Sequence, residues 1–184
     1  MSIDRVFSLK GFGTIVTGTL IEGKISIDDE MIIYPSEKKV KVRNLQVHGC
    51  DVKTAYAGQR TAINLSNIKV SEIQRGDVIA ETGSVEESMM IDVNISLVEH
   101  CKKSLKHWDR IRVFHGTKQI LCRIVPLNED EIPYGESGYA QLRLEEKIVA
   151  KKGDRFIIRS YSPMDTIGGG IIIDTAPKKH KIYD

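Results

Sequence analysis

Hydrophobic and polar residues alternate in short runs along most of this chain, and the three- and four-residue spacing of an amphipathic helix is nearly absent. The runs are rich in β-branched residues, and turn residues such as glycine, proline and aspartate separate them. We predict one helical turn near residues 70–74 and a weaker one near residues 104–108. The predicted strands cover residues 14–21, 31–34, 40–47, 60–65, 89–97, 111–115, 119–127, 140–144, 155–160 and 170–174.

Many short strands at this spacing are typical of β-barrels and sandwiches rather than of alternating strands and helices. A polar stretch at residues 83–88 interrupts the pattern before a new apolar run begins. We therefore predict an all-β protein with two consecutive antiparallel β-barrels, residues 1–84 and residues 88–175. Residues 176–184 have the composition of a basic linker, and we expect them to lead to C-terminal domains outside this chain.

The composition excludes several classes of protein. With 184 residues, 41% of them hydrophobic and 28% charged, the chain can bury a core like that of an ordinary globular protein. It has no apolar run of about 20 residues and no signal segment, so we expect a cytoplasmic protein without a membrane contact. Three widely spaced cysteines predict reduced thiols, and a net charge of +2 predicts only local contacts to any nucleic acid.

Gly11 and Gly13 resemble part of a nucleotide-binding glycine loop. Such a loop also needs a lysine followed by serine or threonine at the start of a helix, whereas β-branched residues follow here. The sequence therefore predicts no GTP site. No histidines, cysteines or carboxylates show metal-ligand spacing, and no catalytic constellation stands out, so we expect neither a metal site nor an enzyme.

Three consecutive glycines at residues 168–170 allow two interpretations, and the sequence leaves both open. The backbone of this strand could pack closely against a neighbouring backbone, or the bare main chain could let an RNA backbone approach. The tripeptide at residues 75–77, Arg-Gly-Asp, is interpreted as a turn that leads into a strand at residues 78–80 rather than as an adhesion motif.

Nearly the whole chain resembles domains two and three of the translational GTPases, the elongation factor Tu superfamily. The N-terminal segment is specific to that superfamily, and the run Arg159-Ser160-Tyr161-Ser162-Pro163 with the three glycines is similar to its bacterial selenocysteine-specific branch. The segments that carry the resemblance are residues 4–7 with 10–19, 42–49, 57–65, 72–78, 138–145, 153–163 and 166–170.

The resemblance implies that the first barrel holds the amino acid of a charged tRNA. In general elongation factors the positions that match Asp4 and Arg5 are typically both acidic, and the position that matches Arg60 is typically asparagine. This chain thus gains positive charge at two points. The residues implied for the aminoacyl pocket are Asp4, Arg5, Phe7, Thr17, His48 and Arg60, with His48 on a bordering strand.

The added charge suits selenocysteine. A selenol is a much stronger acid than a thiol or a hydroxyl, so selenocysteine is largely anionic at pH 7 while serine on the same tRNA is neutral. A cationic pocket attracts the selenolate. Serine bound there would displace water from the charges of the pocket without giving them an ionic contact in return. Asp4 would hold a guanidinium in place. By themselves, Asp4, Arg5 and Arg60 are also consistent with a surface ion-pair cluster that contributes little, and this alternative stays open.

Two further sets of contacts follow from the resemblance. An apolar shelf and bare backbone suit the stacked base of the terminal adenosine, and arginine with exposed backbone amides suits the T-stem backbone. The residues implied for the adenosine are Leu9, Gly11, Ile15 and Gln46. Those implied for the T-stem are Arg159, Thr166, Gly168 and Gly169.

The resemblance implies a tRNA-binding fragment of a selenocysteine-specific elongation factor, which delivers selenocysteinyl-tRNA to the ribosome during protein biosynthesis. GTP, magnesium and hydrolysis would belong to an N-terminal GTPase domain outside this chain, and the mRNA hairpin to C-terminal domains. Two alternatives remain: the same barrels of a general elongation or initiation factor, or a β-barrel protein–protein adaptor. Arg5 and Arg60 argue against the first, and salt-dependent tRNA binding would separate the second.

Overall fold

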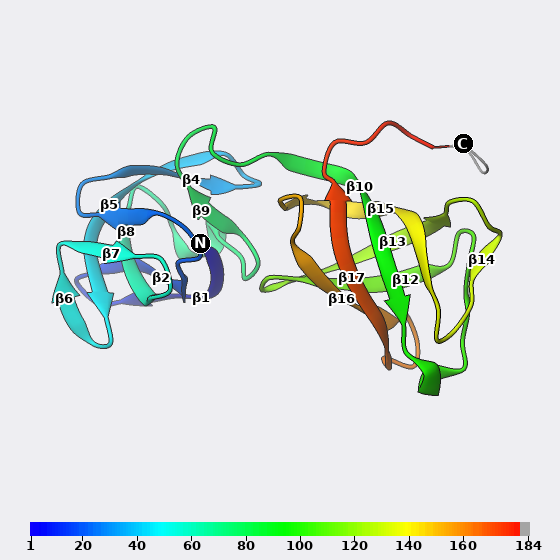
Figure 1. Ribbon diagram of the computed structural model, residues 1–184. Coiled ribbons are helices and arrows are strands. Elements are labelled where there is room, and N and C mark those ends of the chain that lie inside the picture. The colour runs from blue at the N-terminus through cyan, green and yellow to red at the C-terminus, as the bar shows by residue number, and fades with distance from the viewer. Residues whose placement is uncertain (181–184) are drawn as a thin grey trace. The chain divides into compact units, whose positions relative to one another are not determined.

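Two closed β-barrels follow each other along the chain, as predicted (Figure 1). The structure, a computed structural model, describes residues 1–180 and divides the chain into two units, Met1–Val85 and Glu86–Asp184. The helices that occur between residues 1 and 180 are two 3₁₀ turns of three residues each, so none is long enough to cross a membrane.

The first unit is a barrel with the strand order β4-β9-β1-β2-β8-β5, which closes through pairing of β5 with β4. The short strand β6 extends from β5, and β3 pairs with β7 as a separate ribbon. The bounds are β1 Ser2–Leu9, β2 Gly13–Thr19, β3 Lys24–Ser26, β4 Glu30–Tyr34, β5 Lys38–Val47, β6 Cys50–Val52, β7 Thr54–Tyr56, β8 Arg60–Ser66 and β9 Val78–Ala80, with the 3₁₀ turn η1 at Val70–Glu72.

Alternation along these strands fills the barrel interior with aliphatic side chains. Ile3, Val16, Leu45, Ile63 and Ile79 are all fully buried and come from five different strands of the same barrel. Each such burial contributes about 1.5–3 kcal/mol, so this unit has a core of its own. Residues in between point outward, and the candidate site lies on that outer face.

The second unit is a closed barrel with the strand order β10-β15-β13-β12-β16-β17. Its core includes Val93, Val113, Ile124, Leu142 and Ile158, all fully buried. The bounds are β10 Glu87–Leu97, β11 Leu105–Lys106, β12 Arg110–His115, β13 Lys118–Pro126, β14 Glu131–Ile132, β15 Ser137–Val149, β16 Arg155–Ser160 and β17 Thr166–Asp174, with the 3₁₀ turn η2 at Glu99–Cys101.

The triple glycine lies in β17, where the backbone runs close to both neighbouring strands. A Cβ on Gly168 would lie 2.3 Å from the carbonyl oxygen of Ser96, and one on Gly170 would lie 2.1 Å from that of Asn94. Real Cβ atoms do not approach so closely, so only glycine fits without a shift of β10. Close packing of backbone against backbone, one of the two interpretations of this motif, therefore accounts for these glycines.

One predicted helical turn is confirmed and the other is wrong. The turn predicted near residues 70–74 is present as η1. Residues 104–108 instead contain the strand β11, where Leu105 is fully buried and pairs with Ile132. This pairing joins segments distant in the sequence, and the local pattern carries no sign of it.

The start of the predicted linker lies against the second barrel. The side-chain amide of the buried Gln141 donates to the carbonyl oxygen of Lys178 at 2.9 Å, and Arg143 donates to that of His180 at 3.0 Å. The His180 ring bonds Asp92 at 2.6 Å. Residues 176–180 are thus tied to β10 and β15, and residues 181–184 of the predicted linker lie outside the described residues.

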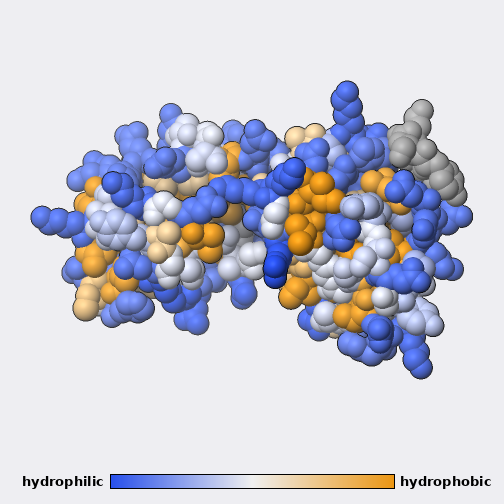
Figure 2. Space-filling model, in the orientation of Figure 1, coloured by the Kyte–Doolittle hydropathy of each residue, from blue (hydrophilic) through white to orange (hydrophobic). Residues whose placement is uncertain are grey.

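On the face of the second unit that Figure 2 presents, hydrophobic residues gather near β10 and β17 among hydrophilic ones. Met89 of β10 and Ile171 of β17 are 46% and 45% exposed. Exposed apolar residues are common on folded proteins, so these two do not by themselves indicate a function, and the charged residues of this barrel are the better guide to it.

Candidate nucleic-acid interface

A β-bulge in the first strand aims Asp4 at Arg60. In the pairing of β1 with β2, Ile3 lies opposite Gly18 and Arg5 lies opposite Thr17, so Asp4 is the extra residue. Bulges re-aim side chains in this way. The Asp4 carboxylate accepts a hydrogen bond of 2.7 Å from the Thr17 hydroxyl and two from the Arg60 guanidinium, at 2.5 and 3.1 Å.

This geometry stabilises the charged forms of both partners. The hydrogen bonds from Arg60 hold the pKa of the Asp4 carboxyl below its ordinary value, and the bond from Thr17 acts in the same direction. The Asp4 carboxylate raises the pKa of Arg60 in turn. Because the Arg60 side chain is 52% exposed, solvent screens the pair and its contribution to stability is small. Two guanidinium nitrogens face Asp4, which leaves further N–H groups of Arg60 available.

Arg5 adds a second cation beside this pair. Its side chain is exposed, and among residues 1–180 the structure records no hydrogen bond or ion pair for it. Its charge nevertheless contributes to the lowered pKa of Asp4. The three charged residues together carry one net positive charge on the outer face of the barrel. The structure therefore brings together Asp4, Arg5, Thr17 and Arg60 of the predicted aminoacyl pocket.

An apolar row lies next to these charges on the same face. Phe7, which is 37% exposed, pairs with Ile15, and Ile15 pairs with Asn64 on the next strand. Leu9 is 50% exposed at the end of β1, where the backbone N–H of Phe12 donates to its carbonyl oxygen. Of the residues predicted for the adenosine, Leu9 and Ile15 thus lie on neighbouring strands, and Gly11 is exposed in the turn between them.

Gln46 belongs to a polar group that the sequence did not reveal in full. Its side-chain amide and that of Asn44 both donate to the same carboxylate oxygen of Asp51, each at 2.9 Å. These two bonds hold the pKa of Asp51 below its ordinary value, and the bond from Gln46 has the larger effect. Asn64 pairs with Asn44, and its buried side-chain oxygen accepts no hydrogen bond from the described residues. The two-residue spacing of Asn44 and Gln46 indicates that both lie on the same face of β5. Asn64 lies beside them only because β8 pairs with β5, which the sequence does not display.

The placement of His48 on a strand is wrong. His48 and Gly49 form the turn between β5 and β6, with φ angles of 52° and 81°. Both values fall in the left-handed region that tight hairpins require, and the pair Val47–Cys50 closes the hairpin. Within the described chain, no hydrogen bond or ion pair joins His48 to Asp4 or Arg60.

In the second unit, the predicted T-stem residues differ in exposure. Thr166 is exposed and pairs with Arg159, whose guanidinium donates to the carbonyl oxygen of Met164 at 2.6 Å and lies 5.9 Å from the Phe114 ring. Gly168 is buried between strands, and Gly169 is half-buried. Of the two members of the set that have side chains, Thr166 is exposed and Arg159 is half-buried.

A larger cationic surface appears on the same barrel through strand register. Arg110 lies directly opposite Arg123, and Arg123 lies directly opposite Arg143. Like charges in directly opposite positions destabilise a sheet. Glu145 offsets the charge of Arg110, which donates two hydrogen bonds to its carboxylate at 2.7 and 2.6 Å. Arg112 continues the surface, since it pairs with Arg159. We call residues 110, 112, 123, 143 and 159 the arginine surface.

Aromatic rings are interleaved with these arginines. The guanidinium carbons of Arg110 and Arg112 lie 4.8 and 5.2 Å from the centre of the Tyr161 ring, and that of Arg143 lies 5.2 Å from the Trp108 ring. Trp108 and Tyr161 are 46% and 44% exposed. Cations held over exposed aromatic rings can contact both phosphates and bases, so the arrangement is suited to a nucleic acid.

Comparisons with known proteins agree with the two-barrel division. Residues 13–80 match the family model described as elongation factor Tu domain 2. Residues 92–179 match the one described as the β-barrel domain of the selenocysteine-specific elongation factor. Each barrel thus matches a family of translation elongation factors, and the second matches the selenocysteine-specific one. The predicted resemblance is thereby confirmed.

Relatives in this family match the chain over nearly its whole length. The selenocysteine-specific elongation factor of Desulfomicrobium baculatum is 39% identical over 97% of this chain, and that of Methanocaldococcus jannaschii is 31% identical over 95%. The crystal structure of the translation elongation factor SelB from Methanococcus maripaludis in its apo form aligns over 96% of the chain with a TM-score of 0.83 and 26% identity.

The chain covers only part of each relative. It spans 28% of the D. baculatum factor, 41% of the M. jannaschii factor and 42% of the M. maripaludis chain. The elongation factor Tu domain 2 match begins at residue 13, so it leaves out Asp4, Arg5 and Phe7 of β1.

Proposed function

We propose that this chain is the tRNA-holding part of a selenocysteine-specific elongation factor. Its first barrel would hold the selenocysteinyl-adenosine end of selenocysteinyl-tRNA, and its second barrel would contact the T-stem. The observation that carries this proposal is the cluster around Asp4: one carboxylate fixes Arg60, while Arg5 remains without a side-chain partner in the described chain.

The charge of this cluster selects between two ligands of nearly equal shape. Arg60 is held by Asp4 and presents its remaining N–H groups, and Arg5 supplies a second positive charge. An anionic selenolate gains charge-assisted contacts there, whereas the neutral hydroxyl of serine does not. Two such contacts give a preference on the order of 100-fold or more.

The neighbouring residues suit the rest of the tRNA end. Phe7 and Leu9 offer an exposed apolar shelf for the terminal base, with the buried Ile15 paired to Phe7, and Gln46 offers a fixed amide at its edge. The arginine surface of the second barrel, with Thr166, offers cations and aromatic rings to the sugar–phosphate backbone of the T-stem.

The chain by itself would be a binding module rather than an enzyme. GTP and magnesium would be bound by a GTPase domain outside this chain, which is also its proposed intramolecular partner. Binding to the ribosome would deliver the tRNA at recoded stop codons, and recognition of the mRNA hairpin would belong to C-terminal domains. The cytoplasm is the compartment where these partners meet.

The experiment joins the chain to a GTPase domain of the family and measures, with GTP present, affinities for one tRNA charged with selenocysteine or with serine. The proposal predicts a preference of about 100-fold for selenocysteine and an affinity that falls as salt rises. Equal affinities would instead favour a general translation factor. Absence of salt-dependent tRNA binding would favour a protein–protein adaptor.

A further inference from the structure

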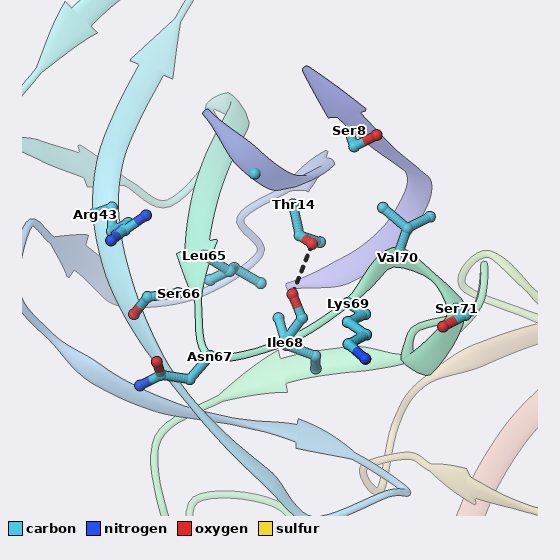
Figure 3. A pocket seen from close by; sticks show the side chains of 11 residues that line it. Ser8, Thr14, Arg43, Leu65, Ser66, Asn67, Ile68, Lys69, Val70 and Ser71 are labelled. Carbon is cyan, nitrogen blue, oxygen red and sulfur yellow. Dashed lines mark hydrogen bonds between the residues drawn. The ribbon is translucent and has the colours of Figure 1, made fainter. Parts of the chain in front are cut away.

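A pocket of about 550 Å³ opens in the first unit, beside the ends of β1 and β8 (Figure 3). It is a wide, open depression in the surface rather than an enclosed cavity. Among the side chains that line it are two cations, three serine hydroxyls and an amide. They belong to Arg43, Lys69, Ser8, Ser66, Ser71 and Asn67.

The pocket is separate from the outer face that carries Asp4 and Arg60. None of the residues predicted for the aminoacyl pocket or for the adenosine lines it. Its wall includes Thr14 and Leu65, whose side chains are buried, whereas the outer-face site is built from the residues that alternate with them. The proposed function therefore does not use this pocket.

Arg43 reaches the pocket because of a second β-bulge. In the pairing of β5 with β8, Val42 lies opposite Leu65 and Asn44 lies opposite Asn64, so Arg43 is the extra residue. Its side chain is exposed, and the structure records no hydrogen bond or ion pair for it within residues 1–180. A bulge that directs an unpaired guanidinium to a pocket is a feature typical of binding sites.

The opposite wall is the segment 67–71, which a buried hydrogen bond fixes. The Thr14 hydroxyl donates to the carbonyl oxygen of Ile68 at 2.7 Å, drawn as the dashed line in Figure 3. In this view Arg43 lies on one side of the pocket and Lys69 with Ser71 on the other, with Leu65 and Ile68 between them. The two cations thus line the same pocket from different walls, with apolar side chains between them.

The charge of the pocket is positive. None of the described residues that line it is acidic. The acid close to Lys69 is Glu72, and its carboxylate bonds Lys38 and accepts from the backbone N–H of Lys69 at 2.7 Å. Glu72 is paired with Lys38 and also feels the charge of Lys69, so Arg43 is the pocket cation for which residues 1–180 record no ion pair.

We propose that this pocket binds the phosphate group of a ribonucleotide, either free or as one unit of an RNA chain. Arg43 would contact two phosphate oxygens with its planar guanidinium, and Lys69 would act as a point charge on the opposite side. The hydroxyls of Ser66 and Ser71 would donate to the remaining oxygens, and Leu65 and Ile68 would lie under the sugar.

The test follows backbone amide signals of residues 65–71 by NMR while adenosine 5′-monophosphate is added to the full chain. The expected result is a saturable shift of these signals that weakens about five- to tenfold in Arg43→Gln and in Lys69→Gln. Lys24→Gln, which removes another exposed lysine of the same unit, on β3, is the matched control and should bind like the unaltered chain. Melting curves check that each variant folds.

Two further probes identify the source of the phosphate. A single-stranded RNA hexamer that shifts the same amides at lower concentration than the mononucleotide would identify RNA as the ligand, and equal affinities would identify a free nucleotide. Inorganic phosphate should bind more weakly than both, since it lacks the sugar. The proposal is overturned if the amides of residues 65–71 do not shift, or if both variants bind the mononucleotide like the Lys24→Gln control. Neither outcome depends on the selenocysteine preference.

Discussion

Arg60 of β8 holds the carboxylate of Asp4 in β1 with two nitrogens, at 2.5 and 3.1 Å, although β2 lies between the two strands. The contact is possible because the bulge at Asp4 turns its side chain along the outer face. A residue that is acidic in the general pattern of the superfamily thus becomes, in this chain, the anchor of a cation.

The pH dependence of stability tests this pair. Because the pKa of Asp4 is lower in the folded chain than its ordinary value of about 3.9, the carboxylate stabilises the fold above that pH and loses this effect as pH falls through the folded pKa. We expect Asp4→Asn to melt slightly below the unaltered chain at pH 7, and the two curves to converge near pH 2. Thermal unfolding followed by circular dichroism measures the difference.

The control for this comparison is Glu81→Gln, a substitution of an exposed carboxyl in the same unit. It should leave the melting temperature nearly unchanged at every pH. A gap between the unaltered chain and Asp4→Asn that stays constant from pH 7 to pH 2 would contradict the proposed hydrogen bonding of Asp4.

Gly170→Ala is expected to destabilise the second barrel. The new Cβ would lie 2.1 Å from the carbonyl oxygen of Asn94 and 2.7 Å from the ring of Phe156, so β17 must shift away from β10. Overpacking of this kind typically costs about 1–3 kcal/mol, and more where backbone must move. Gly83→Ala provides the comparison, because its Cβ meets nothing within 4 Å and only its left-handed backbone adds strain, about 1–2 kcal/mol. Denaturant unfolding should rank Gly170→Ala as the more destabilising, and the reverse order would be inconsistent with the close approach.

Most strands were predictable because their residues alternate or are β-branched, as at Arg60–Ser66. Strands of two residues, such as Leu105–Lys106 and Glu131–Ile132, were missed because they exist only through their pairing with each other. The same reason explains what was missed in the site. Asn64 and the facing arginines at 110, 123 and 143 come together through strand register, which a single sequence does not display.

The arginine surface predicts a specific salt dependence. Each arginine that contacts a phosphate contributes about one unit to the slope of log affinity against log salt. We therefore expect Arg123→Gln to weaken tRNA binding and to lower this slope by about one, while Arg123→Lys keeps the slope. Filter-binding titrations over a range of salt concentrations measure it, using the chain joined to a GTPase domain of the family. If Arg123→Gln and the unaltered chain have the same slope, this arginine does not contact RNA.

We infer that the two cations beside Asp4 discriminate a selenolate from a hydroxyl. The most direct measurement of this discrimination is the ratio of affinities for one tRNA charged with selenocysteine or with serine, determined for the GTPase-joined chain and for Arg5→Ala and Arg60→Ala. We expect each substitution to lower the ratio about tenfold through weaker binding of the selenocysteine form alone. A ratio that is unchanged in both variants, or a loss that is equal for the two charged tRNAs, would contradict it.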